Sequence, residues 1–299
     1  MKVVAGADVG GTKIDIRVVA LDGTLRAERR CASDGWDASP VDAAADRLLR
    51  ELTATVPDGD ELAAVGVGAQ GCDTQEHCAR LAEAVTAAAG VPAAVVNDAA
   101  LLVPAAGLDR GIGLIAGTGS IGVGADAAGN VLFAGGWGWV LGDEASAPGI
   151  VREATRAVLA AHDAGLPDDG LLAALLGHFG AADPPALARI VNDRPEPGHW
   201  GPGAPAVFRA ADAGSALAAR VVDEAAAHLQ TLVDRLTRRG AVGGTVVAAG
   251  TVLARQPGLT NRLRARLATT HPGLTLRLLD TPPVTGAVTL AHHKLGLTP

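Results

Sequence analysis

The order of strand-like and helix-like segments repeats between the two halves of this chain, and that repeat restricts the fold more than any other feature. Gly10-Gly11 and Asp22-Gly23 are turn signals between the first three strand-like segments. The first half predicts three strands and then helices alternating with strands, at residues 3–9, 13–20, 24–30, 40–55 (helix), 62–69, 75–89 (helix) and 93–97.

The second half predicts the same order, at residues 111–117, 120–125, 130–134, 144–163 (helix), 214–239 (helix), 244–249, 257–269 (helix), 274–279 and 284–295 (helix). The stretch 164–205 is rich in Gly, Pro, Asp and Ala, and we expect a partly helical insertion there with a loop at 194–198. The sequence therefore predicts an α/β fold of two domains, each of βββαβαβα type, with a cleft between them.

Composition argues against several classes of function. No apolar stretch approaches the roughly 20 residues of a membrane-spanning helix. Residues 1–8 run directly into a strand without a signal-peptide pattern, so we expect a cytoplasmic protein with no membrane partner. The formal net charge is −7, aromatic residues make up 2% and there is no Tyr, which argues against nucleic acid as a partner and favours a small molecule.

The three cysteines, Cys31, Cys72 and Cys78, are too few for a disulfide framework. Their spacing fits no closed zinc site. We expect all three to be reduced, structural thiols.

The segment Asp8-Val9-Gly10-Gly11-Thr12-Lys13 connects the first two predicted strands. Glycines at such a turn let backbone N–H groups approach phosphate oxygens, while Thr12 and Lys13 add a hydroxyl and a cation. Asp8, at the end of a buried strand, is placed to hold a hydrated Mg²⁺. The alternative is an ordinary Asp/Gly hairpin turn.

A second Gly-rich turn, Ala116-Gly117-Thr118-Gly119-Ser120, occupies the equivalent place in the second half. By itself this turn is weak evidence for a ligand site. Two such turns at matching places predict a pair of phosphate-binding loops that face each other across the cleft. Two unrelated hairpin turns remain the alternative.

Asn97 and Asp98 follow the apolar strand that ends at Val96. Ligands of α/β sheets gather at the carboxyl ends of strands. Phosphoryl transfer needs a group that accepts the proton of the attacking hydroxyl, and a carboxylate is the usual choice. The alternative for Asp98 is a helix N-cap, which the following Ala-Ala-Leu-Leu would suit.

The most unusual segment is GGWGWVLGDEASA at residues 135–147, which holds two of the four Trp residues among glycines. Paired carboxylates can accept hydrogen bonds from sugar hydroxyls, and a Trp ring offers an apolar wall for the sugar's C–H face. The alternative is an Asp/Glu-capped helix start, with the Trp rings filling a domain interface.

These motifs together resemble the N-acetylglucosamine kinase branch of the BadF/BadG/BcrA/BcrD ATPase family, within the actin-like ATPase and sugar kinase superfamily. The resemblance covers nearly the whole chain, and residues 135–147 are its most specific part, similar to the family's GGWG…GDEGSA signature. It implies two actin-like (ribonuclease H-like) domains: residues 1–105, joined by a C-terminal helix at 284–296, and residues 106–299.

The resemblance also implies roles for individual residues. Asp98 would be the catalytic base, and Asp8 would hold Mg²⁺ through water. ATP would contact Gly10, Gly11, Thr12, Lys13, Gly117, Thr118, Gly119, Ser120, Ala211, Gly250 and Thr251, of which Ala211 lies in the segment that borders adenine in relatives. The sugar would contact Asp34, Trp36, Asn97, Asp98, Gly136, Trp137 and Asp143.

The chain departs from the family pattern in three places. Trp139 stands where the family usually has His, and Ala145 where it has Gly. Asp34-Gly35-Trp36 falls where human-type enzymes carry Asn-His-Trp, so the Asp34 carboxylate could favour the free 2-ammonium of glucosamine over an N-acetyl group.

Glu196-Pro197-Gly198-His199 resembles the ExGH motif of ROK-type sugar kinases and repressors. In that family the motif lies close to the second phosphate loop and precedes a Cys-rich zinc motif. Here it lies far beyond that loop without a Cys cluster, so we interpret it as a loop coincidence.

The expected reaction is ATP-dependent phosphorylation of N-acetylglucosamine or glucosamine at the 6-hydroxyl, by a protein that is a homodimer, as is common among relatives. One alternative is an ATPase that activates an iron–sulfur reductase, which the scattered cysteines disfavour. The other is a non-catalytic sugar-sensing regulator, disfavoured because no DNA-binding helix pair precedes Val3.

Overall fold

The computed structural model describes residues 1–297, and its framework is two five-stranded sheets. The chain divides into two compact units: the first holds Met1–Gly113, Val123–Val131 and the segment from Leu279 onward, and the second holds Leu114–Gly122 and Leu132–Leu278. The predicted α/β fold of two βββαβαβα repeats is confirmed. The domain boundary predicted between residues 105 and 106 stays a prediction.

The first sheet has the strand order β3-β2-β1-β4-β5. Its strands are β1 (Lys2–Val9), β2 (Lys13–Ala20), β3 (Leu25–Ala32), β4 (Glu61–Ala69) and β5 (Ala93–Val96). Strand β1 pairs antiparallel with β2 and parallel with β4, and β4 pairs parallel with β5. The carboxyl ends of β1, β4 and β5 therefore lie at one edge of the sheet, which is where ligands of α/β sheets bind.

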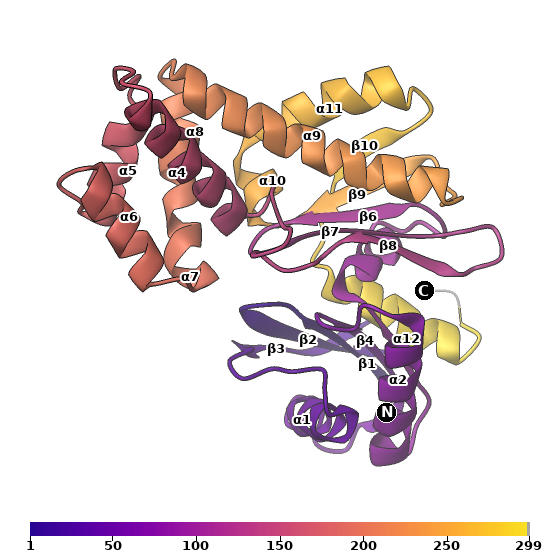
Figure 1. Cartoon of the computed structure of the whole chain (residues 1–299). Helices are drawn as coiled ribbons and strands as arrows, with labels where there is room; N and C mark the ends of the chain where they lie inside the picture. Colours follow the sequence, from indigo (N-terminus) through magenta and orange to yellow (C-terminus); the bar gives the residue numbers. More distant parts are fainter. Residues whose placement is uncertain (298–299) are drawn as a thin grey trace. The chain divides into compact units, whose positions relative to one another are not determined.

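Helices cover both faces of this sheet, with α1 (Val41–Thr53) and α2 (Gln75–Ala89) on one face and α12 (Val284–Lys294) on the other (Figure 1). Glycine lets α12 approach at backbone distance: a Cβ on Gly66 would lie 1.9 Å from the carbonyl oxygen of Ala287. After β5 the chain forms the short helices η1 (Asp98–Leu101) and α3 (Leu102–Ala105).

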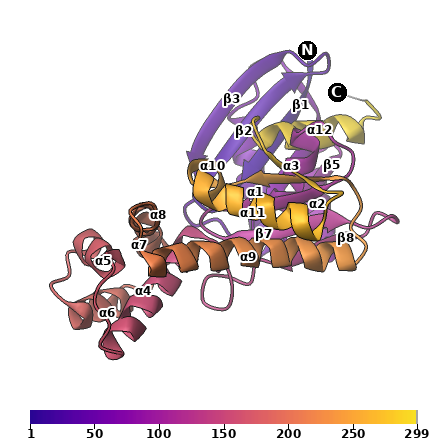
Figure 2. The same ribbon diagram turned by 90° about the horizontal axis from the view of Figure 1, so that it is seen from above.

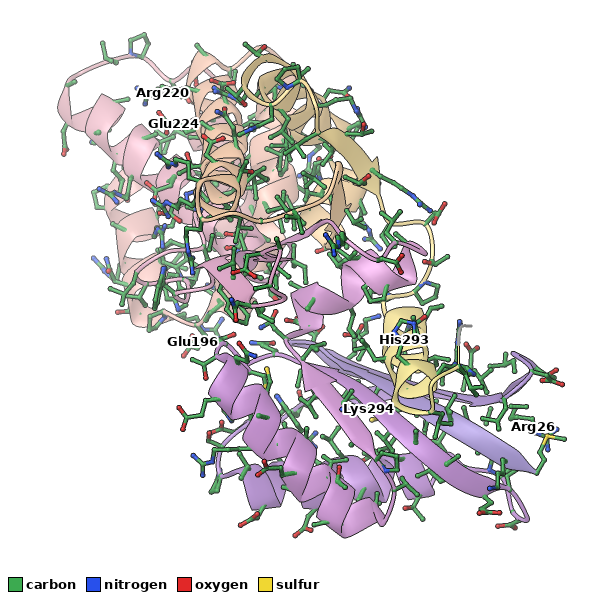
Figure 3. The ribbon with its side chains drawn as sticks, turned by 90° about the vertical axis from the view of Figure 1, so that its right-hand side faces the viewer. Arg26, Glu196, Arg220, Glu224, His293 and Lys294 are labelled. Carbon is green, nitrogen blue, oxygen red and sulfur yellow. The ribbon has the colours of Figure 1, made fainter. Side chains whose placement is uncertain are left out.

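The second sheet has the order β10-β9-β6-β7-β8. Its strands are β6 (Ile112–Ala116), β7 (Ser120–Ala125), β8 (Val131–Gly135), β9 (Thr245–Ala249) and β10 (Thr275–Leu278). The long helices α9 (Ala216–Arg238) and α11 (Pro257–Thr270) run side by side (Figure 2). The short helix α10 (Thr251–Arg255) follows β9. Leu232 and Leu236 of α9 pack on Gly122 of β7, while Arg220 and Glu224 of the same helix form an ion pair in a solvent-exposed position (Figure 3).

The predicted insertion is mostly helical. After α4 (Ala147–Asp163) come α5 (Leu171–Phe179), α6 (Pro184–Asp193), α7 (Pro197–Trp200), η2 (Gly201–Gly203) and α8 (Ala204–Asp212). The loop predicted at 194–198 is wrong in its second half, because Pro197 begins α7, a position where its fixed φ suits a helix.

Within residues 1–297, no single helix has the length and apolar character to cross a membrane; the bent pair α5 and α6 meets those two criteria by length and composition only.

Every predicted strand and helix is present, with ends that differ by at most three residues. The largest difference is at α4, predicted from residue 144 and observed from Ala147. Ser146 explains it, because its hydroxyl accepts a hydrogen bond from the Gly149 N–H and so caps the helix three residues later than expected.

Candidate nucleotide and sugar site

Two carboxylates, Asp8 and Asp98, occupy the ligand-binding edge of the first sheet. Asp8 is the penultimate residue of β1, and Asp98 begins η1, separated from the end of β5 by Asn97 alone. Burial, the charge of Asp98 and the charge of Asp15 raise the pKa of Asp8 to about 7, although the Lys13 ammonium lowers it. Burial also raises the pKa of Asp98 to about 6, against a backbone N–H bond from Ala99 that lowers it.

These two carboxylates have the chemistry that a divalent cation requires. Mg²⁺ is usually held by one or two carboxylates, together with waters and substrate phosphates, and not by a cage of protein ligands. In the described part of the chain, no group of three or more His, Cys, Asp or Glu side chains is arranged to hold a metal. Asp8 and Asp98 repel each other when both are ionised, and a divalent cation held at Asp8 would reduce that repulsion.

The alternative role predicted for Asp98, that of a helix N-cap, is performed by the neighbouring residue Asn97. Asn97 is the N-cap of η1, and its side-chain oxygen accepts a hydrogen bond from the Ala99 N–H at 3.0 Å. Asp98 Oδ1 accepts from the same N–H, which orients the carboxylate without using its second oxygen. The amide of Asn97 donates to Asp73 Oδ1 at 2.9 Å, so Asp73 fixes the residue beside the candidate base.

Asp73 was not predicted as a site residue. It lies in the turn after β4, among Gly71, Cys72 and Thr74, a composition that indicates a turn and no particular chemistry. Its charge raises the pKa of Asp98 further. Only the pairing of β4 with β5 brings this turn beside Asn97.

The first Gly-rich turn connects β1 and β2 as predicted, and the Gly10 N–H donates to the carbonyl oxygen of Lys13 at 3.0 Å. Gly11, Thr12 and Lys13 are exposed to solvent. The Lys13 ammonium lies 2.5 Å from Asp15 Oδ2, an interaction that the sequence did not predict. The turn thus offers exposed donors at the same sheet edge as Asp8.

The predicted sugar segment around Trp36 is tied to the turn after β4. The Trp36 indole N–H donates to the carbonyl oxygen of Gln70 at 3.0 Å. The guanidinium of Arg47 lies 6.0 Å from the centre of the Trp36 ring and donates to the backbone oxygen of Asp34 at 2.9 Å. Asp34 itself is exposed, so its carboxylate is accessible to a ligand.

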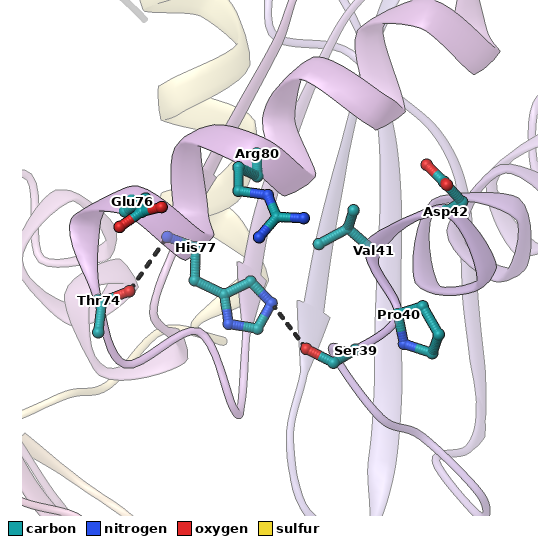
Figure 4. A pocket seen from close by; sticks show the side chains of 8 residues that line it. All are labelled: Ser39, Pro40, Val41, Asp42, Thr74, Glu76, His77 and Arg80. Atoms are coloured by element: carbon teal, nitrogen blue, oxygen red, sulfur yellow. Dashed lines mark hydrogen bonds between the residues drawn. The ribbon is translucent and has the colours of Figure 1, made fainter.

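A polar pocket of about 490 Å³ lies where α1 and α2 begin (Figure 4). His77 forms hydrogen bonds with the Ser39 hydroxyl at 3.3 Å and the Ala38 carbonyl oxygen at 2.9 Å. None of the predicted site residues lines this pocket, which is formed by Ser39, Pro40, Val41, Asp42, Thr74, Glu76, His77 and Arg80.

In the second unit, the predicted second phosphate loop packs against Gly250 and Thr251, two of the residues predicted to contact ATP. The Gly117 N–H donates to Gly119 O at 2.9 Å. A Cβ built on Gly117 would lie 3.6 Å from the Thr251 nitrogen. Gly250 has φ 101°, and a Cβ there would lie 2.2 Å from the Ala116 carbonyl oxygen, so only glycine allows the two turns to approach at backbone distance.

Asp143 is bonded to the second phosphate loop. Its Oδ1 accepts a hydrogen bond from the Ser120 N–H at 3.0 Å. It is the one non-glycine residue of the described chain with positive φ, at 56°. A Cβ on Gly149 would lie 2.1 Å from the Asp143 carbonyl oxygen, so the α4 backbone closes around this residue.

Of the remaining predicted residues of this unit, Gly136 contacts the second phosphate loop, because its N–H donates to the Ser120 carbonyl oxygen at 3.0 Å. Gly136 and Trp137 follow β8, and Trp137 is 74% exposed. Ala211 is in the last turn of α8, before Gly214 with φ 99°. His199 of the EPGH segment lies 5.6 Å from the ring of Phe179, within the helical insertion.

Trp139, which stands where the family usually has His, packs on Trp200 at 5.3 Å between ring centres. Arg152 donates hydrogen bonds to the carbonyl oxygens of Trp139 and Gly142. The Trp-rich loop is therefore anchored to α4 at its second Trp, while Trp137 stays exposed.

Two βββαβαβα units, each with a Gly-rich turn after its first strand, define the class of actin-like sugar kinase folds. Two solved structures show the likeness. A candidate N-acetylglucosamine kinase from Chromobacterium violaceum has a TM-score of 0.73 and 24% identity, covering 97% of this chain and 99% of that one. A ROK family glucokinase from Streptomyces griseus, solved with glucose and AMPPNP, has a TM-score of 0.60 and 20% identity, covering 97% and 98%.

The chain belongs to the BadF/BadG/BcrA/BcrD ATPase family, whose model matches residues 5–291. The resemblance found in the sequence is thereby confirmed. The chain is also 29% identical over 173 residues to the N-acetylmuramic acid/N-acetylglucosamine kinase of Clostridium acetobutylicum. That match spans 54% of this chain and 55% of the relative, about half the length of each.

Proposed function

We propose that this protein is an ATP- and Mg²⁺-dependent kinase that transfers the terminal phosphoryl group of ATP to the 6-hydroxyl of an amino sugar. The observation that carries the proposal is the pair formed by Asp98 and Asp8 at one edge of the first sheet, with pKa values raised to about 6 and about 7. Strongly shifted carboxylates at the carboxyl ends of parallel strands are typical of catalytic sites.

Asp98 acts as the general base in this proposal. Its carboxylate accepts the proton of the sugar hydroxyl as that oxygen attacks the γ-phosphorus. A pKa of about 6 leaves Asp98 ionised at neutral pH, yet makes it a stronger base than an exposed aspartate. Asn97, fixed by Asp73, would position the same hydroxyl.

The phosphates of ATP would be bound by the two Gly-rich turns at residues 10–13 and 117–120, through backbone N–H groups other than those of Gly10, Gly117 and Ser120, which already form hydrogen bonds within the protein. The adenosine would be bound by Gly250, Thr251 and the segment at Ala211. Asp143 orients the second loop through Ser120, and the same carboxylate, with Gly136 and Trp137, would contact the sugar. When bound, Mg²⁺ neutralises charge on the transferring phosphoryl group. Asp8 would hold the ion through water, because Mg²⁺ keeps several waters in its shell.

The acceptor is proposed to be an amino sugar, N-acetylglucosamine or glucosamine. The match to the Clostridium kinase and the Trp36 segment support this class. The exposed Asp34 carboxylate favours a free 2-ammonium, because opposite charges attract and an acetyl group carries no charge. A higher kcat/KM for N-acetylglucosamine than for glucosamine would remove this preference.

The two alternatives have less support. An iron–sulfur cluster shared between subunits needs accessible thiolates, whereas Cys72 and Cys78 are buried and Cys31 donates a hydrogen bond to Glu51. A non-catalytic sensor has no need of a carboxylate with a raised pKa at Asp98. A homodimer and a cytoplasmic location stay part of the proposal, and light scattering on the purified protein tests the former.

A coupled assay of ADP release tests the function. We expect sugar-dependent ADP release with at least one of glucosamine, N-acetylglucosamine, N-acetylmannosamine and N-acetylmuramic acid, at a kcat/KM well above that for glucose. The assay should lose its signal when EDTA removes Mg²⁺. ADP release at the same rate with and without every sugar would contradict a kinase, and a clear preference for glucose would contradict an amino sugar kinase.

A further inference from the structure

A row of three charged residues crosses the first sheet beside the first phosphate loop. Asp8 of β1 lies directly opposite Asp15 of β2, and Asp15 lies directly opposite Arg30 of β3. Residues in such a row share one face of the sheet, with neighbouring Cβ atoms about 4.5–5.5 Å apart. Asp15 therefore stands between a candidate metal ligand and an arginine.

Asp15 is buried and bonded to two cations. The Arg30 guanidinium reaches both carboxylate oxygens, with Nε on Oδ1 and Nη2 at 3.2 Å from Oδ2. The Lys13 ammonium lies 2.5 Å from Oδ2. Burial raises the pKa of Asp15, but the bonds from Arg30 and Lys13 outweigh it and lower the pKa below its ordinary value, so the carboxylate stays ionised.

Cross-strand pairing alone does not explain this arrangement. Like charges placed directly opposite one another destabilise a sheet, and the charge of Asp15 raises the pKa of Asp8. An apolar residue at a position only 7% exposed would avoid that repulsion. The feature that needs a carboxylate here is Lys13, the cation of the first Gly-rich turn.

We propose that Asp15 is a positioning residue of the first phosphate loop: anchored by Arg30, it holds the Lys13 ammonium beside Asp8 without letting the two pair. The inference rests on the proposed function, because it assigns Lys13 to the phosphates of ATP. When a lysine side chain is immobilised it loses rotamer entropy, and Asp15 supplies that ordering before the nucleotide arrives.

The consequence of removing Asp15 follows from the charges around Lys13. Lys13 already lies close enough to lower the pKa of Asp8. Without the Asp15 carboxylate, Asp8 is the remaining acidic neighbour in this row, and an ion pair between Lys13 and Asp8 would compete with both phosphate and metal. Nucleotide binding should weaken, while Asp98 and the chemical step are untouched.

The same two strands supply a matched control. Arg17 of β2 lies directly opposite Glu28 of β3, and the Arg17 Nε donates to Glu28 Oε1 at 2.7 Å. This ion pair joins the same strands as Asp15 and Arg30, in the next row on the same face, and it does not include Lys13. Glu28→Gln breaks a cross-strand ion pair of the same kind. It therefore shows how the loss of one ion pair between β2 and β3, without any effect on Lys13, changes the measured constants.

The first measurement is the kinetics of Asp15→Asn with the sugar that the wild type prefers. We expect KM for ATP to rise about tenfold, the effect of one lost charge-assisted interaction, while kcat changes less than about threefold. Glu28→Gln should keep both constants at wild-type values. A wild-type KM for ATP in Asp15→Asn, or an equal rise in Glu28→Gln, would overturn the inference.

The second measurement does not depend on activity. The chain has three lysines, Lys2, Lys13 and Lys294, the last on the final turn of α12 (Figure 3). Limiting reductive methylation, read by mass spectrometry in the ligand-free protein, compares their reactivity. Lys13 should react more slowly than Lys2 in the wild type and in Glu28→Gln, and as fast as Lys2 in Asp15→Asn. Equal reactivity of Lys13 in all three proteins sinks the proposal.

Arg30→Gln covers the case in which Asp15→Asn does not fold. Because Lys13 still lies 2.5 Å from Asp15 Oδ2, the loss of the Arg30 cation does not leave the buried Asp15 carboxylate without a partner. The variant therefore keeps the carboxylate and removes its anchor. We expect changes in the same direction as for Asp15→Asn but smaller, about threefold in KM for ATP. No change in either KM or Lys13 reactivity would count against the proposal. Failure of the proposed function is recognised separately, by a wild type that consumes no ATP with any sugar.

Discussion

Asn97 and Asp98 divide two tasks that one aspartate could have performed. Asn97 caps η1 and is held by Asp73, which leaves Asp98 with one oxygen on the Ala99 N–H and the other available for chemistry. A residue that has to cap a helix is bound to the backbone through its side chain. The neighbouring asparagine therefore makes Asp98 usable as a base.

Asp98→Asn should lower kcat by a factor of about 10²–10⁴, the usual contribution of a general base, with little change in KM for the sugar. In the wild type, kcat/KM should rise as pH increases through about 6, because Asp98 has to lose its proton before it can accept another. Steady-state kinetics between about pH 5 and 8 measure both effects. Turnover of the variant near the wild-type rate would remove Asp98 from the mechanism.

Asp8→Asn should stabilise the ligand-free protein at about pH 8 and have little effect at about pH 5. The folded-state pKa of Asp8 is raised to about 7, so the native protein binds a proton more readily than the unfolded chain does between about pH 4 and 7. Stability from this group is therefore present at low pH and is lost as pH rises through about 7. Asparagine removes that loss, and we expect a gain of about 1–2 kcal/mol at pH 8.

Urea unfolding of both proteins at these two pH values, with EDTA present, measures the difference. The same variant should have lost Mg²⁺-dependent activity, so the residue would contribute to function at the expense of stability. A variant less stable than the wild type at the higher pH would contradict the raised pKa.

Among the secondary-structure elements, α12 returns from the end of the chain to close the first unit. It packs on β1 and β4 at glycines of the sheet, and on η1 at its own Gly286. A Cβ on Gly66 would lie 1.9 Å from Ala287 O, and one on Gly286 would lie 2.2 Å from Leu101 O. The helix thus packs at backbone distance against β4. This strand lies between β1, which carries Asp8, and β5, which precedes Asp98.

Gly66→Ala should destabilise the protein by more than about 3 kcal/mol, because the backbone of α12 cannot move away without losing its packing. Gly177→Ala is the matched control: Gly177 lies in helix α5 with nothing within 4 Å of an added methyl group, so alanine should be neutral or stabilising by up to about 1 kcal/mol. Thermal unfolding of the two variants tests this. Equal melting temperatures would contradict the close packing of α12.

The register between strands shows what the sequence could not supply. The turn signals and the alternation of segments predicted the strands of both sheets and the helices α1, α2, α4, α9, α11 and α12, because glycines and Asp-Gly pairs mark where strands end. They did not predict α3, α10 or the individual helices of the insertion. The row of Asp8, Asp15 and Arg30 was not predictable, because an irregularity at Val18 and Val19 shifts the pairing of β2 with β3 by one residue. Such a shift changes which side chains lie opposite, and nothing in the local sequence marks it.

The candidate site was predictable to a similar extent. The Gly-rich turns and the strand-end carboxylates stood out because phosphate and metal chemistry restricts residue type. Two features of the site could not be predicted in this way. The role of Asp73 depends on the pairing of β4 with β5, and the hydrogen bond from Ser120 to Asp143 depends on a positive φ at Asp143. Both are properties of the folded backbone.

Across the whole molecule, the two units carry different parts of the proposed chemistry. The first holds Asp8, Asp98 and the Trp36 segment, and the second holds the Gly117 loop, Asp143 and the Gly250 turn. The two copies of the repeated βββαβαβα unit are thus assigned to different ligands. The sugar is assigned mainly to the first, and the adenosine to the second.

Hydrogen exchange should separate the two ligands along the chain. A non-hydrolysable ATP analogue with Mg²⁺ should slow exchange at residues 10–13, 117–120 and 250–251, because backbone N–H groups that bind phosphate or pack against it exchange more slowly. The sugar alone should slow exchange at residues 34–36 and 97–98. Protection by the nucleotide confined to segments outside those three would contradict the site assignment.

Phosphoryl transfer to the sugar can be observed by ³¹P NMR of a reaction containing the protein, Mg²⁺-ATP and the preferred amino sugar. We expect one phosphomonoester, on the sugar 6-oxygen, for each ADP formed, and no such signal with Asp98→Asn. ADP accompanied by inorganic phosphate without a sugar phosphate would identify the protein as an ATPase and would rule out the proposed kinase reaction.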